Sequence, residues 1–138
     1  MDDFRTQLGG VIDVMLAGGI KPSFLVADLF GAEHVKRAHG ADSFESFRSA
    51  AIASISGGAN GAEVFCYDEQ ILVAILPGFP RLKTFALVDK LSRALRLLGQ
   101  SYDCMLEPEF DSIEYDPEKG IAGLISELVK VRLARDVA

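Results

Sequence analysis

The stretch that most constrains the fold is residues 62–78, where two short apolar runs flank a polar triplet. The runs, at residues 64–67 and 71–76, are rich in β-branched, aromatic and aliphatic residues, and Pro77 and Gly78 close the second. This pattern predicts a β-hairpin with Asp68, Glu69 and Gln70 at its tip. Because residues 71–76 are apolar without alternation, we expect that strand to be covered on both faces.

The rest of the chain alternates between helical and strand-like patterns. Apolar residues at helical spacing predict helices over residues 3–17, 31–56 and 82–98 and from residue 121 onward, with a break at Gly40 and an end at Gly99. Apolar runs predict further strands over residues 23–30 and 102–106. The run at 23–30 carries a single carboxylate, Asp28, near its C-terminal end, which makes Asp28 the first candidate for a functional role.

This order of elements predicts an α+β fold with a ferredoxin-like βαββαβ core, in which helices cover one face of an antiparallel sheet. Additional N- and C-terminal helices either cover more of the core or mediate association. We expect a single domain over residues 1–138, with an N-terminal helix in 1–20, the core in 21–115 and a C-terminal helix in 116–138.

Charge and hydropathy exclude several classes of partner. The chain of 138 residues has a net charge of −6, which argues against nucleic acid because a phosphate backbone needs a basic surface. No apolar run reaches the length of about 20 residues that spans a bilayer, and the N-terminus lacks the pattern of a signal peptide. Cys66 and Cys104 show no zinc-binding spacing and are expected to be reduced thiols. We therefore expect a cytoplasmic protein without a cofactor or metal.

Three landmarks give the chain a family resemblance: the order of elements, Asp28 at the end of the first strand, and a hairpin that runs to Leu-Pro-Gly. Together they resemble the GGDEF domain of diguanylate cyclases over about residues 3–135. In that family an Asp ends the first strand and a Gly follows twelve residues later, and Asp28 and Gly40 have this spacing. Counting back from Pro77 places the five signature residues at Asp68, Glu69, Gln70, Ile71 and Leu72.

The resemblance also implies that the catalytic residues have been lost. In the family, two glycines at the tip let the backbone approach GTP, whereas Asp68 and Glu69 carry side chains whose negative charge opposes a triphosphate. The third signature residue is a carboxylate that holds magnesium together with the first-strand Asp, and Gln70 offers only a neutral carbonyl. Phe30 replaces a second Asp of the first strand, and Lys36 stands where the family has the Asn that reads guanine. We therefore expect no enzymatic activity.

Two features have more than one interpretation. Asp28 is either a relic metal ligand or a carboxylate that caps the turn or helix after Gly31. An acidic segment after the fourth predicted strand is either a solvated loop or an interaction surface, because clustered charge steers association. Its carboxylates, our candidates for that surface, are Glu107, Glu109, Asp111, Glu114 and Asp116.

The resemblance thus implies a catalytically inactive regulatory or scaffolding module that acts through protein–protein interaction, in a setting related to bacterial cyclic-di-GMP signalling. A protein partner is expected, and a homodimer is included because active relatives work as dimers. The alternative is a non-catalytic sensor that binds GTP or cyclic-di-GMP in the degenerate cleft. It would use Asp28, Lys36 and bases of the last helix, where Lys130, Arg132 and Arg135 lie.

Overall fold

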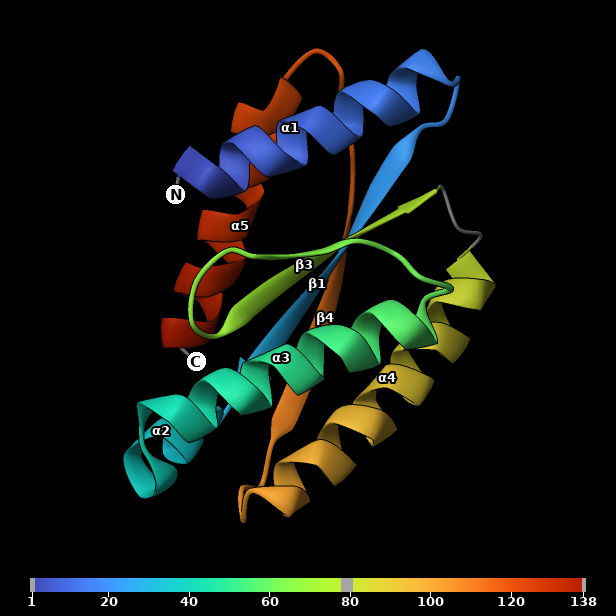
Figure 1. The fold of residues 1–138 in the computed structure, drawn as a ribbon. Coiled ribbons are helices and arrows are strands. Elements are labelled where there is room, and N and C mark those ends of the chain that lie inside the picture. The colour runs from blue at the N-terminus through green and yellow to red at the C-terminus, as the bar shows by residue number, and fades with distance from the viewer. Residues whose placement is uncertain (1, 78–80, 138) are drawn as a thin grey trace.

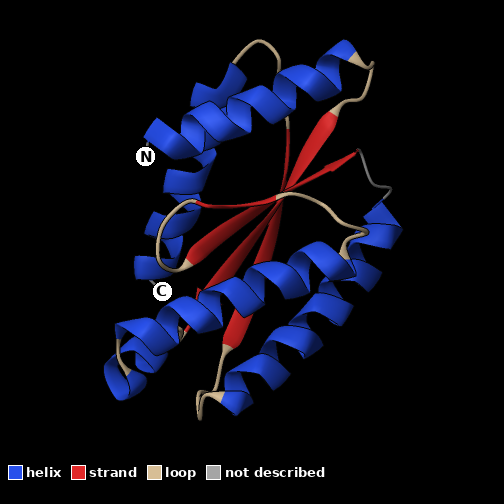
Figure 2. Cartoon of the chain, viewed as in Figure 1, coloured by secondary structure: helices blue, strands red, loops and turns tan. Residues whose placement is uncertain are grey.

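The structure is a computed structural model that describes residues 2–77 and 81–137, and only the backbone of residues 2, 81–84 and 131–137 (Figures 1 and 2). Its elements follow the predicted order along the chain: α1 Asp2–Ala17, β1 Pro22–Phe30, α2 Glu33–His39, α3 Ala41–Gly58, β2 Val64–Cys66, β3 Ile71–Pro77, α4 Arg81–Ser101, β4 Glu107–Glu114 and α5 Gly120–Val137. The four strands form one sheet in the order β2-β3-β1-β4, and every neighbouring pair is antiparallel. The predicted α+β fold with a ferredoxin-like core is therefore confirmed.

Helices cover both faces of this sheet, so the prediction of one covered face was incomplete. Successive residues of a strand point to opposite faces, and β1 sends Leu25 and Ala27 into one core cluster and Phe24 and Val26 into the other. The first cluster lies under α3 and α4, and the second lies under α1 and α5 (Figure 1). The terminal helices thus complete the core. Six consecutive residues of β3 are buried, as its unbroken apolar pattern predicts.

The fourth strand lies later in the chain than the prediction of residues 102–106. β4 spans Glu107–Glu114, whereas Tyr102 and Asp103 form the turn that ends α4, with a positive φ of 54° at Asp103. Because β4 is an edge strand that pairs only with β1, many of its side chains face solvent and are carboxylates. Such a strand lacks the apolar run on which the prediction relied.

Two glycines mark helix boundaries in different ways. Gly40 has a φ of 89° and separates α2 from α3, as its position in the sequence predicts. Gly99 does not end α4, which continues to Ser101. Its role is close packing, because a Cβ added at this position would lie 2.8 Å from the carbonyl oxygen of Cys104.

None of the helices that the structure describes is long and apolar enough to cross a membrane.

Candidate functional site

The C-terminal end of β1 and the tip of the β2–β3 hairpin lie side by side, next to α2 (Figure 1). Asp28 is opposite Ile71 in the antiparallel register, and the N–H of Leu29 donates to the carbonyl of Gln70 at 2.9 Å. This pairing brings together the two segments that the sequence analysis singled out, although about 40 residues separate them in the chain. We call Asp28, Lys36, Glu69 and Gln70 the hairpin site.

Asp28 is fully buried and hydrogen-bonded to the hairpin. Its Oδ1 accepts a hydrogen bond of 2.6 Å from Nε2 of Gln70. A carboxylate only accepts hydrogen bonds, so the Gln70 amide must present its nitrogen, and not its oxygen, to Asp28. Neither interpretation of Asp28 from the sequence anticipated this contact.

This arrangement does not fit a magnesium ion between the two side chains. Magnesium binds oxygen ligands at about 2.0–2.1 Å, whereas here an N–H group of Gln70 occupies the space in front of Oδ1. Within residues 2–77 and 81–137, no described group of three or more His, Cys, Asp or Glu side chains could hold a metal ion.

The carboxylate of Asp68 organises the turn at the hairpin tip. Its Oδ1 accepts hydrogen bonds from the backbone N–H groups of Gln70 at 2.8 Å and of Ile71 at 2.7 Å. An Asx turn of this kind stabilises a tight connection without glycine. Two backbone donors that could otherwise bind an anion are therefore engaged inside the turn.

Lys36 and Glu69 form an ion pair across the mouth of the site. Nζ of Lys36 donates to Oε1 of Glu69 at 2.8 Å, and this hydrogen bond, together with the lysine charge, lowers the pKa of Glu69. Nζ of Lys36 also lies 5.7 Å from the ring centroid of Phe44, as does the guanidinium of Arg48. Cations at this distance from an aromatic face are attracted to it.

The space left at the site is small. A cavity of about 80 Å³ is lined by Glu33, Phe44, Glu69 and Gln70, whereas pockets for small organic ligands measure roughly 300–1,000 Å³. Ile71 and Leu72, at the last two signature positions, are 0% and 1% exposed and belong to the core. Phe30, which replaces the second Asp, is 52% exposed at the end of β1.

The bases of the last helix add little to this site as described. Nζ of Lys130 bonds to Oε1 of Glu127 at 3.3 Å, and the side chains of Arg132 and Arg135 lie outside those that the structure describes.

The carboxylates proposed as an acidic surface are spread along β4 and the turn that follows it. Glu107 and Glu109 are exposed at the start of β4, and Asp111 is half-buried on the sheet face, where burial and the nearby charge of Asp28 raise its pKa. Glu114 and Asp116 lie at the far end. Seven residues of strand separate Glu107 from Glu114, about 23 Å.

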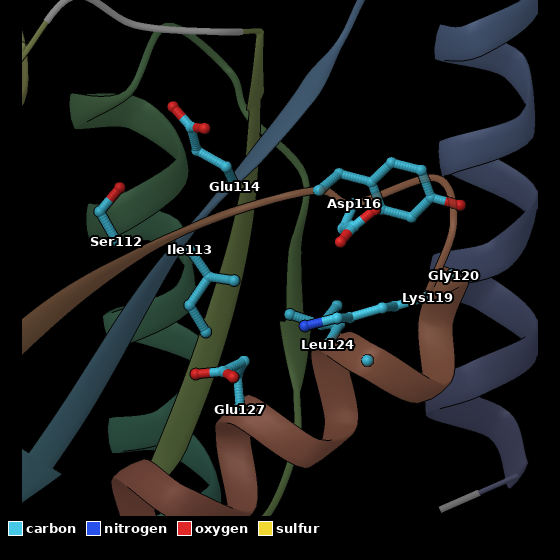
Figure 3. Close-up of a pocket in the computed structure, with 10 residues that line it drawn as sticks. Ser112, Ile113, Glu114, Asp116, Lys119, Gly120, Leu124 and Glu127 are labelled. Carbon is cyan, nitrogen blue, oxygen red and sulfur yellow. The ribbon is translucent and has the colours of Figure 1, made fainter.

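The far end of β4 borders a second cavity, of about 330 Å³, between this strand and the first turns of α5 (Figure 3). Its charged side chains are of both signs, and Figure 3 shows the carboxylate of Glu114 pointing away from that of Glu127. Asp116 accepts a hydrogen bond of 3.0 Å from the N–H of Glu118 and so shapes the turn before α5. This end of β4 is separate from the hairpin site.

The sequence analysis named three residues of the hairpin site as departures from the family pattern, but it missed how they pair. It did not predict that Lys36 would meet Glu69, or that Gln70 would meet Asp28. Phe44, whose ring centroid lies 5.7 Å from each of two cations, was not predicted either. One indication was available: each pair joins positions that surround the same ligand in the family.

Comparison of the structure with solved structures finds several GGDEF domains. The diguanylate cyclase SiaD of Pseudomonas aeruginosa, solved with its activator SiaC, superimposes with a TM-score of 0.69 at 10% identity over 88% of this chain and 50% of that chain. The GGDEF domain of DgcB from Caulobacter crescentus, solved with c-di-GMP, gives a TM-score of 0.64 at 10% identity over 89% and 76%. A sensory box/GGDEF family protein from the same organism gives 0.61 at 14% identity over 86% and 79%.

These likenesses establish a GGDEF-like fold for the chain, which spans half the length of the SiaD chain. No protein-family model matches the sequence, and no curated protein matches it either.

Proposed function

We propose that this chain is a catalytically inactive GGDEF-like module that works through contacts with other proteins, in bacterial signalling by cyclic-di-GMP. Three lines of support point the same way: the resemblance at Asp28 and residues 68–72, the fold shared with GGDEF domains, and the contacts within the hairpin site. The loss of catalysis and the role in protein contact are both parts of the proposal.

The observation that carries the loss of catalysis is the hydrogen bond of 2.6 Å between Gln70 and Asp28. Phosphoryl and nucleotidyl transfer depend on metal ions and fixed charges that stabilise the charge developing on the phosphate. In this chain a neutral amide fills the place where the resemblance puts the second metal-binding carboxylate. Asp28 is therefore hydrogen-bonded to a side chain of its own chain, in a position where an active enzyme needs a metal ion.

Two observations favour protein contact over nucleotide binding in the same cleft. The cavity of about 80 Å³ is several times smaller than a typical ligand pocket. Lys36, which stands where the resemblance puts the Asn that reads guanine, is already paired with Glu69. A bound nucleotide would have to break this ion pair and push aside a tip that carries two carboxylates, Asp68 and Glu69.

Support for a protein partner comes from the surface and from one structural neighbour. Glu107 and Glu109 are exposed on β4, at an edge of the sheet, and charge at such a place selects partners and speeds encounter. The neighbour SiaD was solved in complex with an activator protein. A module that has kept the fold can keep such a surface after its active site has degenerated.

The test of the enzymatic part is incubation of the purified protein with GTP and either magnesium or manganese, followed by chromatography of the nucleotides. We expect no cyclic-di-GMP. In parallel, thermal unfolding is followed with GTP, GDP and cyclic-di-GMP, and we expect no stabilisation. A ligand at 100 times its dissociation constant would stabilise the fold by about 2.7 kcal/mol. Stabilisation that Lys36→Met abolishes would replace this proposal with the sensor function, and product formation that Asp28→Ala abolishes would refute it outright.

The test of the interaction part is a pull-down from the source cells that compares the unmodified protein with a Glu107→Lys/Glu109→Lys variant. We expect the reversal to remove a partner that the unmodified protein captures. The matched control is Glu114→Lys, which reverses an exposed charge at the far end of the same strand. Equal capture by all three proteins would remove this end of β4 from the proposal.

A further inference from the structure

A groove of about 540 Å³ lies between α1 and the edge of the sheet, on the face that α1 and α5 cover. One wall is the exposed side of α1, and the other is formed by the end of β3 and by Glu63, just before β2. Glu63 and Ile75 lie side by side, because the N–H of Ile75 donates to the carbonyl of Glu63 at 3.0 Å. The groove is separate from the hairpin site, and its volume lies within the range of roughly 300–1,000 Å³ that is usual for small-molecule sites.

Most of the side chains in the groove are apolar. Val11, Val14 and Met15 of α1 face Ile75 and Pro77 of β3 across it. Val14 is 73% exposed, so a ligand in the groove would remove apolar surface from water. A largely apolar lining with a few polar groups is the usual composition of a site for a small organic molecule.

Gly10 keeps the groove open in the middle of α1. Glycine in the interior of a helix is unfavourable compared with alanine. A Cβ added at Gly10 would meet nothing within 4 Å, and Gly10 does not have a positive φ. Neither close packing nor backbone conformation therefore requires a glycine here, whereas the absence of a side chain adds to the free space in the groove.

The charge in the groove is negative. Among the described residues that line it, Glu63 is the one that ionises, and it is exposed. Its carboxylate forms no ion pair or hydrogen bond within the described part of the chain. Asp3 is also exposed and lies one helical turn before Gln7, which lines the groove. The groove therefore favours an apolar ligand that carries a positive charge.

We propose that this groove binds a small organic cation, an amine with an aliphatic or aromatic body. The apolar body lies along α1 over Gly10 and Val14, and the ammonium group pairs with the carboxylate of Glu63. Charge-assisted hydrogen bonds of this kind orient a ligand. The side-chain oxygens of Thr6 and Gln7, which also line the groove, are further acceptors for the N–H groups of the ligand.

A protein partner fits the groove less well than a small molecule does. Nine described residues line it, whereas a stable protein interface takes about 20–30 residues on each side. The inference goes beyond the proposed function, because it depends neither on the loss of catalysis nor on a protein partner at β4.

The test is an NMR titration of the ¹⁵N-labelled chain with hexylamine, octylamine, 1-hexanol and hexanoate. We expect hexylamine to cause saturable shifts of the amide signals of Gly10, Val14 and Glu63. Octylamine should bind about tenfold more tightly, because two further CH₂ groups leave water. The uncharged alcohol should bind more weakly than the amine of the same length, and hexanoate should bind most weakly because its charge is repelled by Glu63.

Three variants locate the ligand. Glu63→Gln should weaken the binding of hexylamine by about twofold to fivefold, as expected for an exposed ion pair, and should leave 1-hexanol unchanged. Gly10→Leu should abolish the binding of every probe, because the new side chain fills the groove. Val14→Ser removes exposed apolar surface without disturbing the core and should weaken every probe. The matched control is Glu45→Gln, an exposed carboxylate of α3 on the other face of the sheet, and circular dichroism checks the fold of every variant.

Four outcomes would each overturn the proposal. The first is the absence of saturable shifts with either amine, and the second is binding of hexanoate as tight as that of hexylamine. The third is amine binding that neither Gly10→Leu nor Val14→Ser changes. The fourth is a shift of the same amide signals when the protein is concentrated without any probe, because a second copy of the chain would then occupy the groove.

Discussion

Substitution Gln70→Glu tests directly whether the contact between Gln70 and Asp28 stabilises the fold. It changes one atom of the side chain and replaces the N–H donor at 2.6 Å from Oδ1 of Asp28 with a second carboxylate oxygen. Because Asp28 is 0% exposed, water cannot screen the two charges effectively, and the pair is expected to take up a proton in the folded state.

The energy of that proton uptake sets the size of the effect. Unfolded glutamate has a pKa of about 4.3, and one pKa unit corresponds to about 1.36 kcal/mol. Holding the introduced carboxyl group protonated therefore costs about 3.7 kcal/mol at about pH 7 and about 1 kcal/mol at about pH 5. The pKa of the group is raised in the folded state, so the loss of stability grows as the pH rises above the unfolded pKa and disappears below it.

Urea unfolding followed by circular dichroism at these two pH values measures the difference. We expect the variant to lose about 3–4 kcal/mol at about pH 7 and to recover most of it at about pH 5. Magnesium should restore part of the stability at neutral pH, because two facing carboxylates are ligands that this ion accepts, and it should leave the unmodified protein unchanged. Glu69→Gln, in the same turn but exposed, is the control and should show little change. Equal stability of Gln70→Glu and the unmodified protein at both pH values would refute the reasoning.

Four further substitutions test other contacts. Gly99→Ala should destabilise the fold by about 1–3 kcal/mol, because the added methyl meets a backbone carbonyl at 2.8 Å. The same change at Gly10, where a Cβ meets nothing within 4 Å, should stabilise the fold by about 0.5–1 kcal/mol. Thermal unfolding measures both variants, and melting temperatures that shift in the same direction would contradict the packing role of Gly99. Asp68→Ala should cost about 1–2 kcal/mol in urea unfolding, since two turn N–H groups lose their acceptor; an unchanged midpoint would mean that the turn does not need this carboxylate. An NMR titration should find the pKa of Glu69 below its ordinary value and should find it returned toward that value in Lys36→Met. The ion pair therefore stabilises the fold above the pKa of Glu69 in the unfolded chain, and this stabilisation is lost as the pH falls through the pKa of Glu69 in the folded protein. A Glu69 pKa that is the same in Lys36→Met and in the unmodified protein would exclude this pairing.

The helices and the central strands were predictable because their local patterns agree with their tertiary environment. β3 is unbroken in its apolar run and is covered on both faces, and Gly40 breaks the helical region where its positive φ requires it. The fourth strand was wrongly placed because an edge strand is not defined by apolarity. Cys104 and Leu106 are buried in the core although they precede β4, and this burial made residues 102–106 resemble a strand.

The β2–β3 hairpin shows which features follow from the sequence and which depend on the tertiary structure. Its composition was sufficient to predict two strands, a polar tip and, through the resemblance, the positions that correspond to the family's signature residues. The sequence by itself thus determined the fold and the absence of a carboxylate at Gln70.

Only the tertiary structure decided what these residues do instead. Gln70 donates to Asp28, and Lys36 pairs with Glu69, because the antiparallel register of β1 and β3 and the packing of α2 bring distant segments within hydrogen-bond distance. Local patterns in the sequence indicate which face of an element is buried. A contact between two distant side chains depends on how whole elements pack, and a single sequence does not specify the distance between them.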